Sequence, residues 1–390
     1  MAKSNPCYNS SEQPAVALVL SGGGARAAYQ VGVMKAVSDI VYRSECGNPF
    51  PIITGTSAGA INASVLASYS KTPRVGVRSL QKVWENFSVD QIYRSDFIGI
   101  VKNTFRWIRT IFSNDFYRNH KLGLFNNSPL VSLLDRVIHY DNIQKCIDSK
   151  QLKALCVTAS CYTTGQTVSF YQSEKKVENW ERYRRIGEKT RITKAHLLAS
   201  ASIPLVFSAV KIGNKLYGDG SVRFLAPLSP AIHLGADKIF IIGVDPENKM
   251  PDEIDTIDPH YPSIGEVAGH VLDSVFIDSL NVDMERIKRV NQTINLIPEQ
   301  KAKESGLRPI ETFVISPSKD LSRLASKHFN SLPWLVRFLF KRFGIGNQDG
   351  SNILSYILFE SNYTKELIDL GYKDAMEKKQ NILNFFNHSS

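Results

Sequence analysis

Two segments of this chain pass from a short apolar run into a glycine-rich turn and then into a helical pattern. The first is AVALVLSGGGARAAYQ at residues 15–30, and the second is FPIITGTSAGAINAS at residues 50–64. A short, continuous apolar run is typical of a strand that is buried on both faces of a parallel sheet. Two such strand–turn–helix units predict an α/β fold with a central, mostly parallel sheet flanked by helices.

Three later segments extend this pattern. ALCVTASCYTTGQTVSFYQ (154–172) predicts a hairpin around Gly165, because a glycine between two β-rich runs is typical of a hairpin turn. KLYGDGSVRF (215–224) predicts a strand that ends in a turn, and KIFIIGV (238–244) predicts another buried strand. Beyond about residue 263 the spacing of apolar residues is mostly helical.

A chain of 390 residues is long enough for a sizeable core. No internal repeat, low-complexity tract or clear linker divides it. We expect a flexible N-terminus over residues 1–14 and a catalytic α/β domain over residues 15–245. A mostly helical C-terminal extension, residues 246–390, is expected to pack on that domain.

The composition limits the partners and the compartment. Lys and Arg number 47 against 37 Asp and Glu, a net charge of +10, but no nucleic-acid recognition motif accompanies this charge. The five cysteines have no C-x-x-C spacing, so we expect a reducing compartment, no metal and no cofactor. The chain shows no signal-peptide pattern and no apolar run of roughly 18 residues. We therefore expect a cytoplasmic protein without a transmembrane segment; unconventional secretion and the oligomeric state stay open.

The first glycine turn, SGGGAR at residues 21–26, is a candidate anion-binding site. Consecutive glycines let the backbone approach a ligand closely and expose N–H groups at the start of a helix. Such groups stabilise a phosphate or a tetrahedral oxyanion, although a plain strand-to-helix turn explains the glycines equally well. Arg26 favours an anion, because a cation in the first turn of a helix is locally unfavourable unless it meets an anion or braces the loop.

The second and third turns contain the other candidate side chains. In GTSAG, Ser57 lies between Gly55 and Gly59, after a strand and before a helix. This arrangement is the nucleophile elbow with which many hydrolases present a serine. In YGDGS, Asp219 lies between two glycines at the end of a strand, and on its own a plain Asp-Gly turn is the simpler interpretation.

A serine nucleophile needs a base that accepts its proton, and histidine is the usual one. The chain has eight histidines, but none lies in a glycine-flanked turn. His196 and His233 fall at interior positions of expected helices, and no acid–histidine pair follows Ser57 in the order of the α/β-hydrolases. These residues alone leave the base of Ser57 unassigned.

The three turns, taken together and in this order, resemble the motifs of the patatin-like phospholipase family. The family pattern is G-G-G-x-R/K, then G-x-S-x-G, then D-G-G/A, and this chain has GGGAR, GTSAG and DGS, with Ser221 where the family varies. The flanking sequences ALVLSGGGARAAYQVGVMKA and ASASIPLVFSAVKIGNKLYGDGSV are also similar to the family. The resemblance covers roughly residues 15–245, and the C-terminal third looks similar to bacterial members.

This resemblance implies a three-layer sandwich and a Ser-Asp dyad without a histidine. Ser57 would attack the ester carbonyl, and Asp219, in the proton-acceptor motif with Gly220, would be the general base. Backbone N–H groups of the first turn would bind the oxyanion, while Arg26 would support that loop or meet the lipid phosphate. The residues of this oxyanion hole would be Gly22, Gly23, Gly24, Ala25 and Arg26.

The implied function is a serine lipid acyl hydrolase of the phospholipase A or lysophospholipase type that acts on phospholipids at a membrane surface. Two basic, aromatic segments, residues 98–121 and 326–346, are candidates for peripheral membrane contact; an ordinary core-facing helix is the alternative for each. Two other functions compete. One is a neutral-lipid esterase, lipase or thioesterase, and the other is a catalytically silent lipid- or anion-binding protein.

Overall fold

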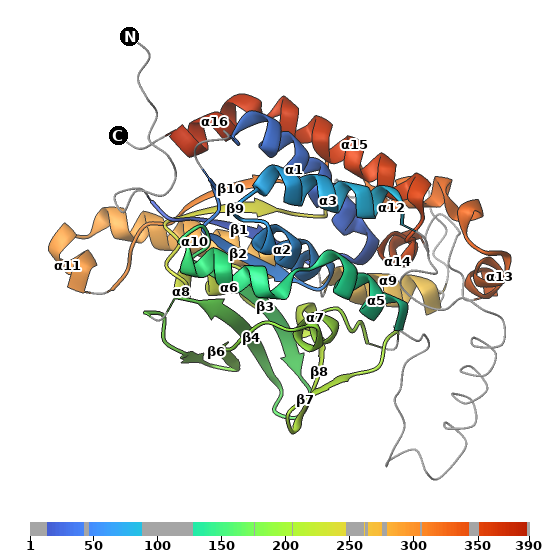
Figure 1. Cartoon of the computed structure of the whole chain (residues 1–390), viewed down its shortest axis with the longest axis horizontal. Helices are drawn as coiled ribbons and strands as arrows, with labels where there is room; N and C mark the ends of the chain where they lie inside the picture. The colour runs from blue at the N-terminus through green and yellow to red at the C-terminus, as the bar shows by residue number, and fades with distance from the viewer. Residues whose placement is uncertain are drawn as a thin grey trace.

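Helices cover both faces of a central β-sheet in the computed structural model of the chain (Figure 1). The expected membrane-binding segment 98–121 and residues 1–13 of the expected flexible N-terminus lie outside the described residues. The structure describes residues 14–42, 47–87, 128–174, 176–204, 206–246, 261, 264–274, 279–304, 306–342 and 351–387.

The sheet is mixed and has ten strands. Eight of the strands pair in the order β10-β9-β1-β2-β3-β4-β6-β5. The other two are β8, which pairs with β3, and β7, which pairs with β8. The strands are β1 (Val16–Leu20), β2 (Ile52–Thr56), β3 (Ala154–Cys161), β4 (Gln166–Ser173), β5 (Trp180–Arg182), β6 (Arg185–Lys189), β7 (Val210–Ile212), β8 (Lys215–Asp219), β9 (Lys238–Ile242) and β10 (Glu311–Ile315).

One half of the sheet is parallel. Strands β10, β9, β1, β2 and β3 pair in parallel, so that Ala17 of β1 lies opposite Ile52 on one side and Ile239 on the other. Every residue of β1, β2 and β9 is buried, as expected of strands that are covered on both faces. The prediction of a parallel sheet from the two strand–turn–helix units is confirmed for this half.

The side chains of β1 alternate between two hydrophobic cores. Leu18 and Leu20 point into the larger core, whereas Ala17 and Val19 point into the smaller core on the opposite face. The predicted helix–sheet–helix sandwich is therefore confirmed. The larger core includes α1 (Ala28–Ile40), α2 (Ala58–Ser68), α3 (Pro73–Glu85) and α15 (Ser361–Glu377), and the smaller core includes α8 (Ser229–His233) and α10 (Ser279–Leu296).

The other half of the sheet contains antiparallel pairs. Strands β3 and β4 form the hairpin expected around Gly165, whose φ of 68° lies in the left-handed region. Strand β8 pairs antiparallel with the end of β3, where Asp219 lies opposite Ala159. Strand β2 pairs with the preceding residues on the same edge of β3, where Thr56 lies opposite Thr158, because β4 occupies the other edge of β3. The last residues of β2 and β8 therefore lie next to each other along one edge of β3.

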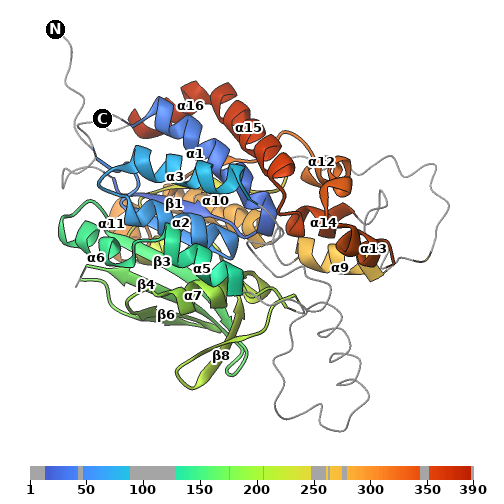
Figure 2. The same cartoon turned by 45° about the vertical axis from the view of Figure 1, so that its right-hand side comes forward.

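The C-terminal region packs closely on the first helix. Figures 1 and 2 both show α15 running beside α1. A Cβ on Gly32 would overlap the carbonyl of Ile368, and a Cβ on Gly371 would overlap the carbonyl of Tyr29. The region also supplies β10, an edge strand of the sheet. The division of the chain at residue 245 stays a prediction.

Shorter helices complete the fold. In the described part of the chain, none of the helices is long and apolar enough to cross a membrane. They are η1 (Gly24–Ala27), α5 (Ser128–Val137), α6 (Tyr140–Asp148), α7 (Lys194–Ser200), η4 (Gly220–Arg223), α9 (Ile264–Asp273), α11 (Glu299–Glu304), α12 (Leu321–Lys327), η7 (Phe329–Ser331), α13 (Trp334–Arg342), α14 (Ser351–Ile357) and α16 (Lys379–Asn387).

Candidate active site

Ser57 occupies the sharp turn between β2 and α2. Its φ of 54° and ψ of −129° are unusual for a residue with a side chain, which is the strained geometry of a nucleophile elbow. Both flanking glycines are sterically required. A Cβ on Gly55 would overlap the carbonyl of Gly59, and a Cβ on Gly59 would overlap the carbonyl of Leu20 in β1. The G-x-S-x-G pattern is thus explained by local packing.

Asp219 meets Ser57 along one edge of β3, where the ends of β2 and β8 face each other. The Ser57 hydroxyl donates a hydrogen bond to Asp219 Oδ2 with an Oγ–Oδ2 distance of 2.6 Å, although the residues are 162 positions apart in the chain. The short turn after Asp219 requires glycine, because a Cβ on Gly220 would overlap the carbonyl of Thr158. Strand pairing therefore brings the second and third glycine turns together.

The carboxyl group of Asp219 is fully buried. Burial raises its pKa from about 4 to about 6, and hydrogen bonds from the Ser57 hydroxyl and from Ser221 act in the opposite direction. One of these bonds is from the backbone N–H of Ser221 to Oδ1, at 2.9 Å. The result is a carboxylate that is a stronger base than an exposed aspartate and still ionised at neutral pH.

Ser200 supports the elbow and was not singled out from the sequence. Its hydroxyl accepts a hydrogen bond from the backbone N–H of Ser57 at 2.9 Å and donates one to the carbonyl of Thr158 at 2.6 Å. Ser200 is the last residue of α7, within the stretch ASAS that precedes Pro204. The small residues at the end of this helix were the only feature of the sequence that could have indicated a contact between Ser200 and the Ser57 turn.

The first glycine turn lies next to the elbow. Gly24 has a φ of 53°, which favours glycine, and begins the short helix η1. Among the described residues, none accepts a hydrogen bond from the backbone N–H of Gly23 or Gly24. Gly24 and Ser57 line the same pocket.

The arrangement agrees with one protein family. The family profile described as Patatin-like phospholipase matches residues 18–232, which is more than half of the chain. The chain belongs to the patatin-like phospholipase family. Ser57 and Asp219, together with all three glycine turns, lie within the matched residues.

Individual relatives of this patatin-like protein match over short stretches. Patatin-like phospholipase domain-containing protein 7 of Rattus norvegicus is 42% identical over 67 residues, which are 17% of this chain and 4% of the rat protein. Lysophospholipase nte1 of Aspergillus terreus is 40% identical over 85 residues, 20% of this chain and 5% of the fungal protein. Human GIVD cytosolic phospholipase A2, solved with methyl gamma-linolenyl fluorophosphonate, aligns over 96% of this chain and 59% of its own, with 11% identity and a TM-score of 0.40.

An apolar pocket adjoins Ser57 in this patatin-like protein. Its lining is almost entirely hydrophobic and includes Trp84, Leu133, Ile203 and Phe359. Such a pocket is suited to an alkyl chain and would exclude a charged headgroup, because burying a charge without a partner is costly.

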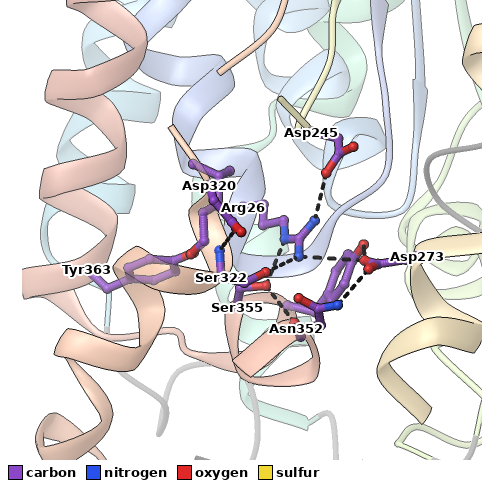
Figure 3. Close-up of polar contacts among 10 residues, drawn as sticks. Arg26, Asp245, Asp273, Asp320, Ser322, Asn352, Ser355 and Tyr363 are labelled. Carbon is purple, nitrogen blue, oxygen red and sulfur yellow. Dashed lines mark hydrogen bonds and ion pairs between the residues drawn. The ribbon is translucent and has the colours of Figure 1, made fainter. Parts of the chain in front are cut away.

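Arg26, the last residue of the GGGAR motif, is only 1% exposed. Figure 3 shows its guanidinium enclosed by residues that come later in the chain, including Ser322 and Ser355. Of the two roles expected for Arg26, the structure favours support of the loop, because a guanidinium enclosed in this way is not presented to a lipid phosphate.

The described histidines do not contact the candidate pair. In the described part of the chain, none of them hydrogen-bonds Ser57 or Asp219. His196 is buried on Phe170, and burial lowers its pKa to about 4. His233 stacks on Trp180, and burial and nearby arginines lower its pKa to about 4 as well. Within the described ranges, no group of His, Cys, Asp and Glu could hold a metal ion.

Proposed function

We propose that this protein is a serine lipid acyl hydrolase of the phospholipase A or lysophospholipase type, in which Ser57 and Asp219 form a catalytic dyad. The observation that carries the proposal is the 2.6 Å hydrogen bond from Ser57 Oγ to a buried Asp219, beside an apolar pocket. Membership of the patatin-like phospholipase family supports the same reaction class.

In the proposed reaction, Asp219 accepts the hydroxyl proton while Ser57 Oγ attacks the ester carbonyl carbon. The negative charge that develops on the carbonyl oxygen is stabilised by N–H groups of the first glycine turn around Gly23, Gly24 and Ala25. The tetrahedral intermediate then expels the alcohol, which takes its proton from Asp219, and leaves an acyl-enzyme. Water, deprotonated by Asp219, attacks this ester and releases the fatty acid and the Ser57 hydroxyl.

The substrate class follows from the pocket and from the relatives. The pocket beside Ser57 is lined almost entirely by apolar side chains, which suit a fatty-acyl chain. The names of the rat and fungal relatives are those of a phospholipase-domain protein and a lysophospholipase, which supports phospholipids over soluble esters.

We further propose that α13 contacts the membrane surface. Trp334 and Phe338 are 67% and 52% exposed on this helix and lie on one face with Lys341, whereas Val336 is buried. Exposed aromatic residues beside a cation are typical of a helix that lies in the interface of an anionic bilayer.

The dyad is tested by the variants Ser57→Ala and Asp219→Asn. Each is expected to lower fatty-acid release from phospholipid vesicles by about 10³-fold or more, because the nucleophile and its base act as a unit. Ser64→Ala is the matched control, since Ser64 is a buried serine of the following helix α2 whose hydroxyl donates to the carbonyl of Ala60 and not to a carboxylate. Full activity in either dyad variant would show that the dyad is assigned incorrectly.

A panel of substrates with one acyl chain separates the competing functions. A phospholipase should hydrolyse phosphatidylcholine and lysophosphatidylcholine faster than the uncharged glyceride and the acyl thioester. Equal or faster rates on the last two would favour an esterase or thioesterase. A fluorophosphonate probe should label wild-type Ser57 and not Ser57→Ala, and a lack of labelling would favour a silent lipid-binding protein.

A further inference from the structure

The guanidinium of Arg26 is bound by side chains that follow it by about 300 positions. Arg26 Nε donates to Ser355 Oγ at 2.8 Å, and Nη2 donates to Ser322 Oγ at 2.9 Å (Figure 3). The guanidinium carbon lies 4.0 Å from the centre of the Tyr356 ring, a cation–π distance. Helices α12 and α14 of the C-terminal region thus supply three direct contacts to a residue of the first glycine turn.

Two carboxylates and a second layer of hydrogen bonds complete this site. Arg26 lies 3.8 Å from Asp245 and 3.7 Å from Asp273. Asp273 accepts hydrogen bonds from the Tyr356 hydroxyl and from the Asn352 amide, each at 2.8 Å. Because a buried charge is stable only with such partners, the position of Arg26 depends on the docking of these later segments.

The same segments also touch the glycine backbone. A Cβ on Gly24 would overlap the carbonyl of Tyr356, and a Cβ on Gly23 would lie 2.7 Å from Val244 Cγ2, next to Asp245. Gly24 is the residue of this turn that lines the pocket with Ser57. The C-terminal helix α14 therefore touches the peptide whose N–H groups would bind the oxyanion.

We propose that Ser355 and Tyr356, with Ser322 and Asp273, are positioning residues of the reaction: through Arg26 and Gly24 they fix the N–H groups of the first glycine turn relative to Ser57. This inference rests on the proposed function. A donor that is misplaced by about 1 Å loses much of its effect on the transition state, whereas substrate binding in the apolar pocket is little changed.

The test compares two pairs of variants in the full-length protein. Tyr356→Phe removes the hydroxyl that binds Asp273. Tyr29→Phe is its control, because Tyr29 also donates to a buried carboxylate of the C-terminal region at 3.0 Å, but this carboxylate, Asp374, is not one of the two beside Arg26. Ser355→Ala removes the acceptor of Arg26 Nε. Its control is Ser326→Ala, since Ser326 likewise donates to a backbone carbonyl of its own helix.

Tyr356→Phe and Ser355→Ala are expected to lower kcat by about tenfold to a hundredfold with KM changed less than about twofold, and to slow fluorophosphonate labelling equally. Hydrogen exchange at residues 22–26 should become faster. The control variants should keep the wild-type kcat even if their melting temperatures fall by as much as those of Tyr356→Phe and Ser355→Ala. Equal losses of kcat in variants and controls, or unchanged exchange at residues 22–26, would overturn the inference.

The two proposals fail in different ways. A wild-type protein that neither hydrolyses esters nor reacts with the probe overturns the proposed function. In that case hydrogen exchange at residues 22–26 in Tyr356→Phe and Ser355→Ala still shows whether Ser355 and Tyr356 fix the first glycine turn. Wild-type hydrolysis with no selective loss in Tyr356→Phe or Ser355→Ala overturns the positioning role alone.

Discussion

At Asp219, burial and hydrogen bonding act on the pKa in opposite directions. Loss of solvent raises the pKa of the carboxyl to about 6, while the bonds from Ser57 and Ser221 limit this rise. The group stays ionised at neutral pH yet accepts a proton more readily than an exposed aspartate. This balance would allow Asp219, in place of a histidine, to act as the base in the proposed dyad.

Asp219→Asn is expected to raise the free energy of unfolding near pH 8 and to have little effect near pH 4. The carboxyl has a pKa of about 4 in the unfolded chain and of about 6 in the folded protein. Between these values the folded state binds more protons, so wild-type stability falls as pH rises and levels off above about pH 6. The gain in the variant is at most roughly 3 kcal/mol.

Urea denaturation of both proteins at a series of pH values measures this effect. Ser57→Ala is the control, because it keeps the buried carboxyl and removes a hydrogen bond that lowers its pKa, so its stability should still fall as pH rises, up to a somewhat higher pH than in wild type. A constant difference between wild type and Asp219→Asn at every pH would contradict the raised pKa.

At the scale of elements, the site depends on which strands and helices meet. Strands β2 and β8 pair with successive residues on the same edge of β3, which places Ser57 next to Asp219. Helix α14 packs its Tyr356 carbonyl against Gly24, at the start of η1. Each of these contacts joins a glycine turn to an element that is distant in the chain.

Gly24→Ala is expected to lower the free energy of unfolding by more than Gly213→Ala. Both glycines have positive φ, 53° and 58°, so each substitution costs about 1–2 kcal/mol in backbone strain. A Cβ on Gly213 meets nothing within 4 Å, whereas one on Gly24 would overlap the Tyr356 carbonyl and add roughly 1–3 kcal/mol. Chemical denaturation measures both losses of stability. Equal losses would contradict the prediction, because they would mean that α14 moves away without cost when a Cβ is added at Gly24.

At the scale of the whole molecule, the C-terminal region serves both the candidate site and a candidate membrane surface. Figures 1 and 2 place α13 at the edge of the molecule, beside α14. Trp334 and Phe338 face outward from α13, while Tyr356 of α14 contacts the first glycine turn. The proposed membrane-binding helix is therefore adjacent to the helix that supports the site.

The double variant Trp334→Ser/Phe338→Ser is expected to bind vesicles of anionic phospholipid at least about tenfold more weakly, because burial of an aromatic side chain in the interface contributes roughly 1.5–3 kcal/mol. Hydrolysis of a soluble short-chain ester should be unchanged. Leu296→Ser on α10 is the control, since Leu296 is 85% exposed but lies on another helix. Vesicle sedimentation measures the affinity, and an equal loss in the control would contradict a role of α13.

The local features of the site could be predicted from the sequence, because they depend on neighbours in the chain. The need for glycine at positions 55 and 59 follows from the sharp turn around Ser57, and the alternation of turns with apolar runs indicates a sheet covered by helices. The order of the three glycine motifs was sufficient to identify the family, and the family profile confirms it.

The contacts between these motifs and their distant partners are seen only in the tertiary structure. Contact between Ser57 and Asp219 spans 162 positions, and contact between Arg26 and Ser355 spans 329. Such pairs depend on the pairing of β8 with β3 and on the packing of α14 against η1, which no local pattern of residues encodes. The strand–turn–helix units could be predicted from the sequence alone, because they follow from local sterics and hydrophobic spacing. The partners of Arg26, the supporting hydroxyl of Ser200 and the burial that shifts the pKa of Asp219 arise only when distant segments pack together.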